Sequence, residues 1–355
     1  MVWARPEFSR GAVRRAGHLI ATPYLPDESY FNDPTAWAEY WEHSEGAFRV
    51  FENWRAAHAY PLNTFQVTLR GRAQRIDAQA LTAQRLKRAP SIIAKLQRFE
   101  KMKLDRMQDI GGCRAVMKDL ASVYKLRRAF DEAHVEHEQE APKDYIENPK
   151  DDGYRSIHLI FRYHGKGEKS VYDGLRIEVQ LRTQIQHAWA TAVETVGLFR
   201  REAIKSGEGD QRWRDFFLRA SQAFAILEKH TRLRGLVLNH DLFDAVRESA
   251  DELDVVNRLR GYQQALTLVG QRQDATSYLL ELDLSEQRLT VSGFSRHQVS
   301  LAQSEYARAE KKLGSSGDVV LVAAGSAKAL KKAYPNYFAD TSLFLKTLNR
   351  IMERY

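Results

Sequence analysis

The sequence predicts an α/β (α+β) protein with two strand-containing units: one has a mixed β-sheet flanked by helices, and the other is a small C-terminal α/β unit. Between residues 106 and 183, short apolar segments alternate with a helical segment. Residues 175–183 alternate apolar and polar side chains without interruption, which is typical of a strand with one buried face. A second strand-rich pattern follows residue 270, after a charged helical stretch. We therefore expect a domain boundary near residue 270.

Composition excludes several classes of protein. The chain has 355 residues, which suits two domains at about 150 residues each, and a net charge of +8 from 54 basic and 46 acidic residues. Its one cysteine, Cys113, excludes an internal disulfide framework and a cysteine-rich zinc site. No apolar run is long enough to span a membrane, and the N-terminus has no secretory signal. We therefore expect a cytoplasmic protein with no membrane or DNA partner.

The expected elements follow from the spacing of apolar residues. In the first unit they are helices over much of 1–80, a strand at 113–117, a helix at 121–133, strands at 156–163 and 172–183, and a helix from 184 toward 199. Further along they are charged helices over 200–272, a hairpin of 277–283 and 288–294, a helix near 298–312, a strand at 318–323 and two short helices.

A basic tract precedes and enters one predicted helix. Residues 85–103 contain seven cations and one anion. Pro90 suits the start of a helix, so that Ser91 and Lys95 lie four apart near its positive end. Two further cations come just before it: Arg85 and Lys87. The tract is either a solvated helix face or a phosphate-binding helix N-terminus.

Two carboxylates fall on segments that predict neighbouring strands. The polar face of 175–183 consists of Arg176, Glu178, Gln180 and Arg182. Asp109 begins the other segment. An edge strand with a solvated face would explain the first pattern. Alternatively, Asp109 and Glu178 hold a magnesium ion and leave room for substrate phosphates, because Mg²⁺ prefers oxygen ligands.

Residues 143–156 form a polar segment between these strands. Asn148-Pro149 and Asp152-Gly153 are turn formers, so we expect an exposed loop. Its cations and aromatic residues are Lys143, Lys150, Arg155, Tyr145 and Tyr154. This combination suits a base and its phosphates, unless the tyrosines merely cap the core.

Together the segments resemble the RelA/SpoT synthetase family over about residues 60–230. The matching motifs, in order, are Arg85-x-Lys87 with Ser91 and Lys95, then Asp109-Ile110-x-Gly112-x-Arg114, then Asp144-Tyr145-Ile146-x-x-Pro149-Lys150-x-x-Gly153-Tyr154-x-Ser156-x-His158, then Glu178-x-Gln180-x-Arg182-Thr183, and His187-x-Trp189-Ala190. The resemblance implies a nucleotidyltransferase-like domain that transfers pyrophosphate from ATP to a ribose 3′-hydroxyl and releases AMP.

The resemblance also implies roles for single residues on the ATP side. Arg85 and Arg114 would sandwich the adenine, which suits the planar guanidinium group. The residues that would hold the phosphates are Lys87, Ser91 and Lys95.

For the reaction and the acceptor, the resemblance implies a second set of roles. Asp109 and Glu178 would bind Mg²⁺, and Glu178 would also take the proton of the attacking hydroxyl. Tyr154 would stack on the acceptor base. The other implied acceptor-binding residues are Lys143, His158, Gln180 and Arg182.

The C-terminal unit contains Tyr334-Pro335-Asn336-Tyr337 and no cysteine. In isolation this motif is a turn with packed rings. In context it resembles the fused toxin–antitoxin synthetases of the CapRel type, in which a cysteine-poor pseudo-zinc-finger domain folds back on the synthetase. The resemblance implies that Tyr334 and Tyr337 obstruct the ATP site. It also implies that the acceptor is the tRNA CCA end and that a phage capsid protein releases the block.

Three interpretations stay open. The first is an autoinhibited, translation-blocking tRNA pyrophosphokinase of anti-phage defence; the second is an alarmone synthetase that uses GDP or GTP. The third is a catalytically dead module that binds RNA or a protein partner, against which the pair of carboxylates argues. The domains expected under the first interpretation are an N-terminal helical extension (1–60), a synthetase (61–235), a helical connector (236–272) and a C-terminal autoinhibitory domain (273–355).

Overall fold

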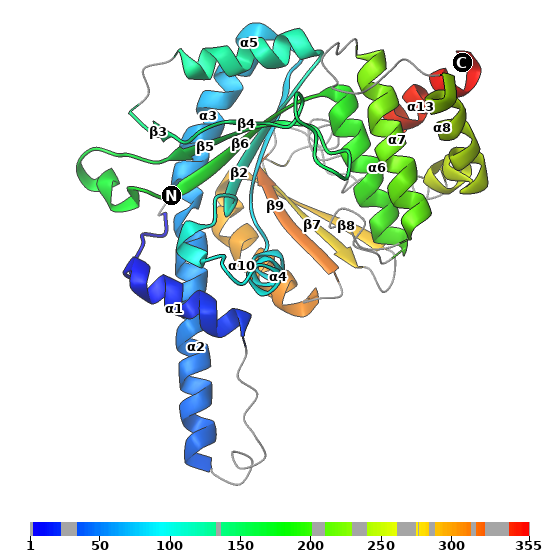
Figure 1. Cartoon of the computed structure of the whole chain (residues 1–355). Helices are drawn as coiled ribbons and strands as arrows, with labels where there is room; N and C mark the ends of the chain where they lie inside the picture. Colours follow the sequence, from blue (N-terminus) through cyan, green and yellow to red (C-terminus); the bar gives the residue numbers. More distant parts are fainter. Residues whose placement is uncertain are drawn as a thin grey trace.

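The computed structural model places the two α/β units next to a helical bundle (Figure 1). The residues that it describes are 3–22, 34–132, 136–200, 210–228, 240–260, 275, 277–283, 288–313, 317–323 and 341–354. In that part of the chain, no helix is long and apolar enough to cross a membrane.

Three helices begin the chain, as expected. They are α1 (Arg10–Ala21), α2 (Pro34–Ala57) and α3 (Ala59–Ile76). Ser9 caps α1 by accepting a hydrogen bond from the backbone of Ala12. Helix α3 lies against the large sheet, with Phe65 and Leu69 buried in its core.

The large sheet is mixed and has strand order β1-β2-β6-β5-β3, with β4 pairing β5. Its strands are β1 (Leu81–Leu86), β2 (Gly111–Met117), β3 (Glu138–Gln139), β4 (Lys143–Asp144), β5 (Ile157–Arg162) and β6 (Arg176–Thr183). Strands β2 and β6 are parallel, and the other pairs are antiparallel. The mixed sheet was predicted, but β1 was not. Strand β6 is interior, so its polar face is not that of an edge strand.

The two faces of this sheet differ sharply in polarity. Ile177, Val179 and Leu181 are fully buried against α3 and α5 (Leu120–Asp131), whereas Glu178 and Gln180 point to the other face and are partly exposed. The alternation seen in the sequence is therefore confirmed. The apolar face anchors the sheet, and the polar face is available for chemistry.

A second core lies in a helical bundle. It consists of α6 (Gln184–Arg200), α7 (Gln211–Leu227), α8 (His240–Glu252) and, from the end of the chain, α13 (Ser342–Arg354). Phe344 of α13 packs against Phe216, Phe217 and Phe224 of α7. The last helix thus lies with the bundle, so the expected segment 273–355 does not form one contiguous unit.

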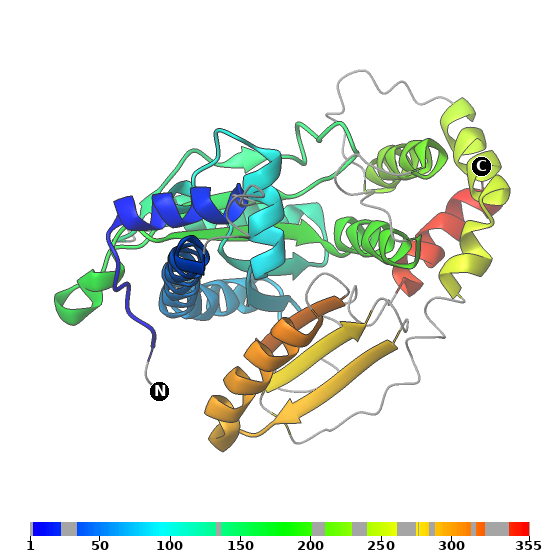
Figure 2. The same ribbon diagram turned by 90° about the horizontal axis from the view of Figure 1, so that it is seen from below.

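The C-terminal unit itself is a small antiparallel sheet with one helix. Strands β7 (Ser277–Asp283), β8 (Arg288–Phe294) and β9 (Gly317–Ala323) have the order β8-β7-β9, and α10 (Val299–Leu313) packs on them (Figure 2). The predicted hairpin, helix and strand are confirmed. The pseudo-zinc-finger assignment stays a prediction.

Glu228, the C-cap residue of α7, connects the helical bundle to the large sheet by hydrogen bonds. It accepts hydrogen bonds from Thr183, the last residue of β6, and from Gln186 of α6. Burial raises the pKa of this carboxyl to about 7, although these hydrogen bonds and the charge of Arg155 oppose the rise. The folded protein therefore holds a proton here that the unfolded chain releases at about pH 4.5.

This raised pKa predicts that stability falls as pH increases from about 4.5 to about 7. The wild-type melting temperature should decline across that window. The corresponding loss in the free energy of unfolding is at most about 3 kcal/mol. Glu228→Gln should flatten the profile, whereas the exposed Glu248→Gln should not. If the melting temperatures of the wild type and of Glu228→Gln changed in parallel between pH 5 and pH 8, this prediction would be contradicted.

Candidate active site

Strand register gathers the predicted site residues on the polar face of the sheet. Arg85 and Glu178 both pair with Gly112, and Arg114 and His158 both pair with Gln180. Paired positions of neighbouring strands present their side chains to the same face. The residues that share this face are Arg85, Arg114, His158, Glu178, Gln180 and Arg182.

Asp109 lies two residues before β2 and binds two lysines. The Nζ atoms of Lys87 and Lys95 are each 2.9 Å from one of its carboxylate oxygens. Burial alone would raise the pKa of Asp109, but the two lysines outweigh this effect and lower it. Asp109 is therefore ionised at neutral pH. It forms ion pairs with both lysines, for which the sequence predicted phosphate partners.

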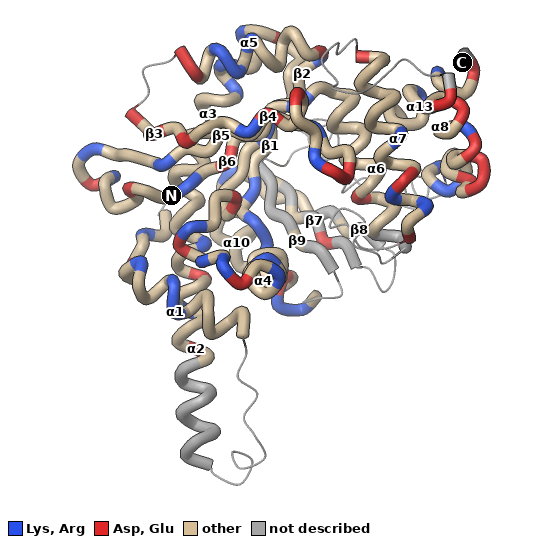
Figure 3. The backbone as a smooth tube through the Cα atoms, in the orientation of Figure 1, with Lys and Arg blue, Asp and Glu red and all other residues tan. Residues whose placement is uncertain are grey.

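Those lysines are positioned by β1 and α4 (Ala89–Arg98), where Lys and Arg cluster (Figure 3). Helix α4 begins at Ala89, one residue before Pro90, and buries Ile92 and Leu96. The Nε of Arg55 in α2 donates to the carbonyl of Lys87 at 2.8 Å. The segment that enters α4 is therefore held by a helix outside the predicted motifs.

Glu178 has its own set of partners. His158 Nδ1 lies 2.9 Å from Oε1, and Gln180 Nε2 donates to Oε2 at 2.6 Å. Burial opposes ionisation, but the charge of His158 and the two hydrogen bonds lower the pKa of Glu178 to about 2. A carboxylate with so low a pKa suits cation binding better than proton abstraction.

Tyr154 connects the polar loop to this carboxylate. Arg182 Nη2 donates to its hydroxyl at 2.5 Å, and the hydroxyl lies 2.8 Å from His158 Nε2. The ring is only 6% exposed, and the ammonium of Lys150 lies 4.9 Å from its centroid. An acceptor base that stacks on Tyr154 would therefore have to displace neighbouring groups.

The prediction of an exposed loop is only partly correct. Lys143 and Lys150 are exposed, but Tyr154 and Arg155 are buried. Arg155 turns inward because its Nε donates to Ser221 Oγ of α7 at 3.1 Å. No motif was recognised in the residues of α7, so this contact was missed.

The two arginines expected around adenine come from adjacent strands. Burial and the positive charges of Arg182 and Arg85 lower the pKa of Arg114 to about 10. Arg114 Nε is buried with no hydrogen-bond partner among the described residues. Three guanidinium groups on one face create a field that favours a polyanion.

A cavity of about 620 Å³ borders Tyr154. Its wall comes from the end of α4, the polar loop, α6 and α7, and includes Arg98, Phe99, Lys150, Asp152, Trp189 and Arg214. This volume suits a nucleotide. Sequence reasoning missed Phe99 and the α7 residues, which lie far from the motifs in the chain.

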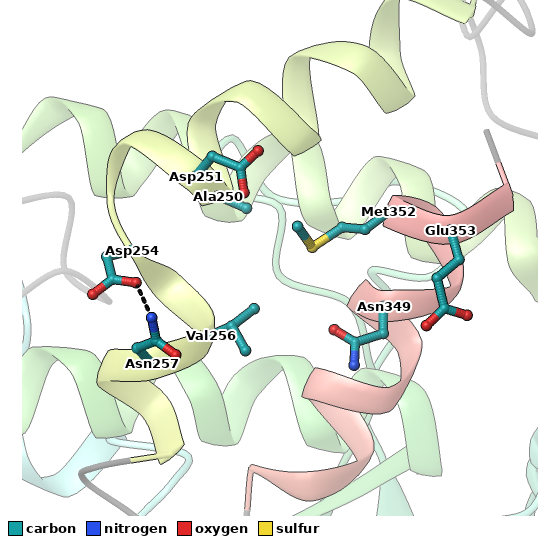
Figure 4. A pocket seen from close by; sticks show the side chains of 8 residues that line it. All are labelled: Ala250, Asp251, Asp254, Val256, Asn257, Asn349, Met352 and Glu353. Carbon is teal, nitrogen blue, oxygen red and sulfur yellow. Dashed lines mark hydrogen bonds between the residues drawn. The ribbon is translucent and has the colours of Figure 1, made fainter.

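Another cavity, of about 370 Å³, lies between α8 and α13 and is lined by Asp251, Asp254 and Glu353 (Figure 4). None of its lining residues belongs to the large sheet.

The donor set fits a magnesium ion that also binds substrate phosphates. Asp109 and Glu178 are both ionised, and Glu178 is close enough to raise the pKa of Asp109 electrostatically. Among the described residues, no group of three or more His, Cys, Asp or Glu side chains could hold a metal ion. Two carboxylates completed by phosphate and water oxygens are a usual arrangement for Mg²⁺.

Comparisons with known proteins agree with this geometry. Residues 84–199 match the model for the region found in RelA/SpoT proteins. The chain is 30% identical to the GTP pyrophosphokinase YjbM of Bacillus subtilis over 162 residues, which are 43% of this chain and 71% of YjbM. It is 31% identical to the GTP pyrophosphokinase YwaC of B. subtilis over 116 residues, 31% of this chain but only 54% of YwaC.

A solved structure also resembles the chain. Small alarmone synthetase 1 of B. subtilis, bound to its product pppGpp, aligns with a TM-score of 0.44 and 22% identity. The alignment covers 51% of this chain and 94% of that protein. The fold, the site geometry and the match to YjbM lead to one conclusion: the chain belongs to the RelA/SpoT family.

Proposed function

We propose that the protein is an ATP-dependent pyrophosphokinase that transfers pyrophosphate to the 3′-hydroxyl of a nucleotide acceptor and releases AMP. The observation that carries this proposal is the pair of ionised carboxylates: Asp109 lies just before β2, Glu178 lies on the adjacent strand β6, and the two are close enough to interact electrostatically. Lys87 and Lys95 adjoin them. A binding module would not need two ionised, partly exposed carboxylates beside the basic N-terminal segment of α4.

The present ion pairs suggest how the residues work. Phosphate oxygens of ATP take Lys87 and Lys95 from Asp109, which frees that carboxylate. Asp109 and Glu178 would hold Mg²⁺, which would neutralise phosphate charge. Arg85 and Arg114 bind the adenine. Such a transfer depends on in-line positioning and charge neutralisation more than on covalent help from the protein.

We place the acceptor base in the cavity beside Tyr154, the one residue with a predicted acceptor role among those that line it. Lys143, His158, Gln180 and Arg182 are proposed to bind the acceptor from the sheet and loop. The names of YjbM and YwaC favour GDP or GTP as the acceptor. The tRNA 3′ end is the other candidate, supported by the net charge of +8. The cavity itself is lined by three cations, Arg98, Lys150 and Arg214, and by three aspartates.

Competition between acceptors tests this proposal. The full chain is incubated with Mg²⁺ and γ-labelled ATP, while deacylated tRNA, GDP and GTP are offered together. The full chain is needed because α13 completes the bundle core. Label on tRNA supports a translation-blocking toxin, and label on guanine nucleotide an alarmone synthetase. Label on neither, from the wild type and from the Glu310→Ala variant described below, would contradict the proposed function.

A substitution separates catalysis from mere binding. Glu178→Gln should lower transfer at least about 100-fold while ATP binding persists, because one cation ligand and its charge are lost. Glu248→Gln, an exposed change on α8, is the matched control and should retain full transfer. An unchanged cellular effect of Glu178→Gln would favour the RNA- or partner-binding alternative.

We further propose that the C-terminal unit restrains the enzyme through α10. Glu310 Oε1 accepts a hydrogen bond from the first amide of α4, Ala89, at 3.2 Å and lies 3.5 Å from Arg55 Nη2. Tyr306 also bonds Arg55. A carboxylate at this helix N-terminus takes the position that favours a phosphate. Tyr334 and Tyr337 lie outside the described residues, and their obstruction of the ATP site, like release by a phage capsid protein, stays part of this proposal.

Removing the carboxylate tests this restraint. Glu310→Ala should raise the rate of AMP release about fivefold or more and lower the apparent KM for ATP, because the amide of Ala89 becomes available to phosphate. Glu305→Ala, which breaks an ion pair with Arg308 elsewhere on α10, is the control. Equal rates in the two variants would refute a restraint at this contact.

A further inference from the structure

Helix α7 packs tightly against the turn that presents Tyr154. The turn closes through hydrogen bonds between Lys150 and residues 153 and 154. Gly153 has a φ of +86°, which favours glycine, and a Cβ built there would lie 3.0 Å from Cβ of Ser221 and 3.3 Å from Cα of Leu218. No larger residue fits, so the turn and the helix meet at van der Waals contact.

The hydroxyl of Ser221 bridges the two neighbours of Tyr154. It donates to the carbonyl of Gly153 and accepts from Arg155 Nε at 3.1 Å. Ser221 is 4% exposed and Arg155 is 5% exposed. One buried hydroxyl therefore fixes the backbone on one side of Tyr154 and the side chain on the other.

The series of contacts continues from Tyr154 to the carboxylate of Glu178. Its hydroxyl lies 2.8 Å from His158 Nε2, and His158 Nδ1 lies 2.9 Å from Glu178. A shift of the turn would move the tyrosine hydroxyl and change the hydrogen bonding of His158. Buried polar networks of this kind respond as a unit.

We infer that Ser221 is a positioning residue for the acceptor: it holds the turn so that Tyr154 and His158 keep the acceptor side of the site in place. Ser221 has none of the predicted substrate-binding roles. The inference rests on the proposed function and extends it to a helix that carries none of the family motifs. Because Ser221 lies on the acceptor side, its loss should leave the ATP side unchanged.

Steady-state kinetics with the full chain test this role, with wild type as reference. Ser221→Ala should lower kcat/KM for the accepted acceptor about tenfold, because two buried hydrogen bonds are lost, and leave the KM for ATP within about twofold. The neighbouring Gln222→Ala is the matched control and should behave as wild type. An equal loss on the ATP and acceptor sides, or no loss, would overturn the inference.

Hydrogen exchange gives a readout that does not require activity. Deuterium uptake by the peptide that spans residues 150–158 should increase in Ser221→Ala and stay at the wild-type level in Gln222→Ala. Unchanged uptake would overturn the positioning role, whatever the kinetics. If wild type transfers label to no acceptor, the proposed function fails separately, and the acceptor role assigned to Ser221 falls with it.

Discussion

The desolvation of charged groups on the polar face of β6 constrains the rest of the site. Glu178 and Arg182 lie on an interior strand, where an unpaired charge would be costly. Gln180 lies between them, accepting from Arg182 Nη2 at 3.0 Å and donating to Glu178 at 2.6 Å. The amide thus links a buried cation to a buried anion along one strand. Other elements then supply the remaining partners, His158 from β5 and Tyr154 from the loop.

A similar constraint explains the ATP side. Asp109 can stay ionised because Lys87 and Lys95 converge on it, and the lysines in turn are held by β1 and α4. These ion pairs give the charged side chains partners of opposite sign before substrate binds. In the proposed mechanism the lysines would pass from carboxylate to phosphate oxygens when a triphosphate binds, so that each would keep an oxygen partner. The C-terminal unit contacts the same helix, which gives it a direct means to oppose that exchange.

Much of this arrangement could be predicted from the sequence. The uninterrupted alternation of 175–183 identified the faces of β6, and the motifs identified Asp109 and Glu178 as partners, although Asp109 precedes β2. Long-range packing could not be read in the same way. The inward turn of Arg155 depends on Ser221, 66 residues later. The return of α13 to the bundle depends on Phe344 fitting among aromatic residues of α7, and the amphipathic pattern of α13 does not specify which core it joins.

The proposed reaction transfers an intact pyrophosphoryl group. Its most direct test follows two phosphates of ATP that carry separate labels. Parallel reactions of the wild-type chain would use ATP labelled at the α- or the γ-phosphate, with Mg²⁺ and the three candidate acceptors. Transfer of pyrophosphate predicts that the α label appears in AMP and that the γ label appears on an acceptor in equal amount. An α label that appears in ADP, or a γ label released only as free phosphate, would contradict it.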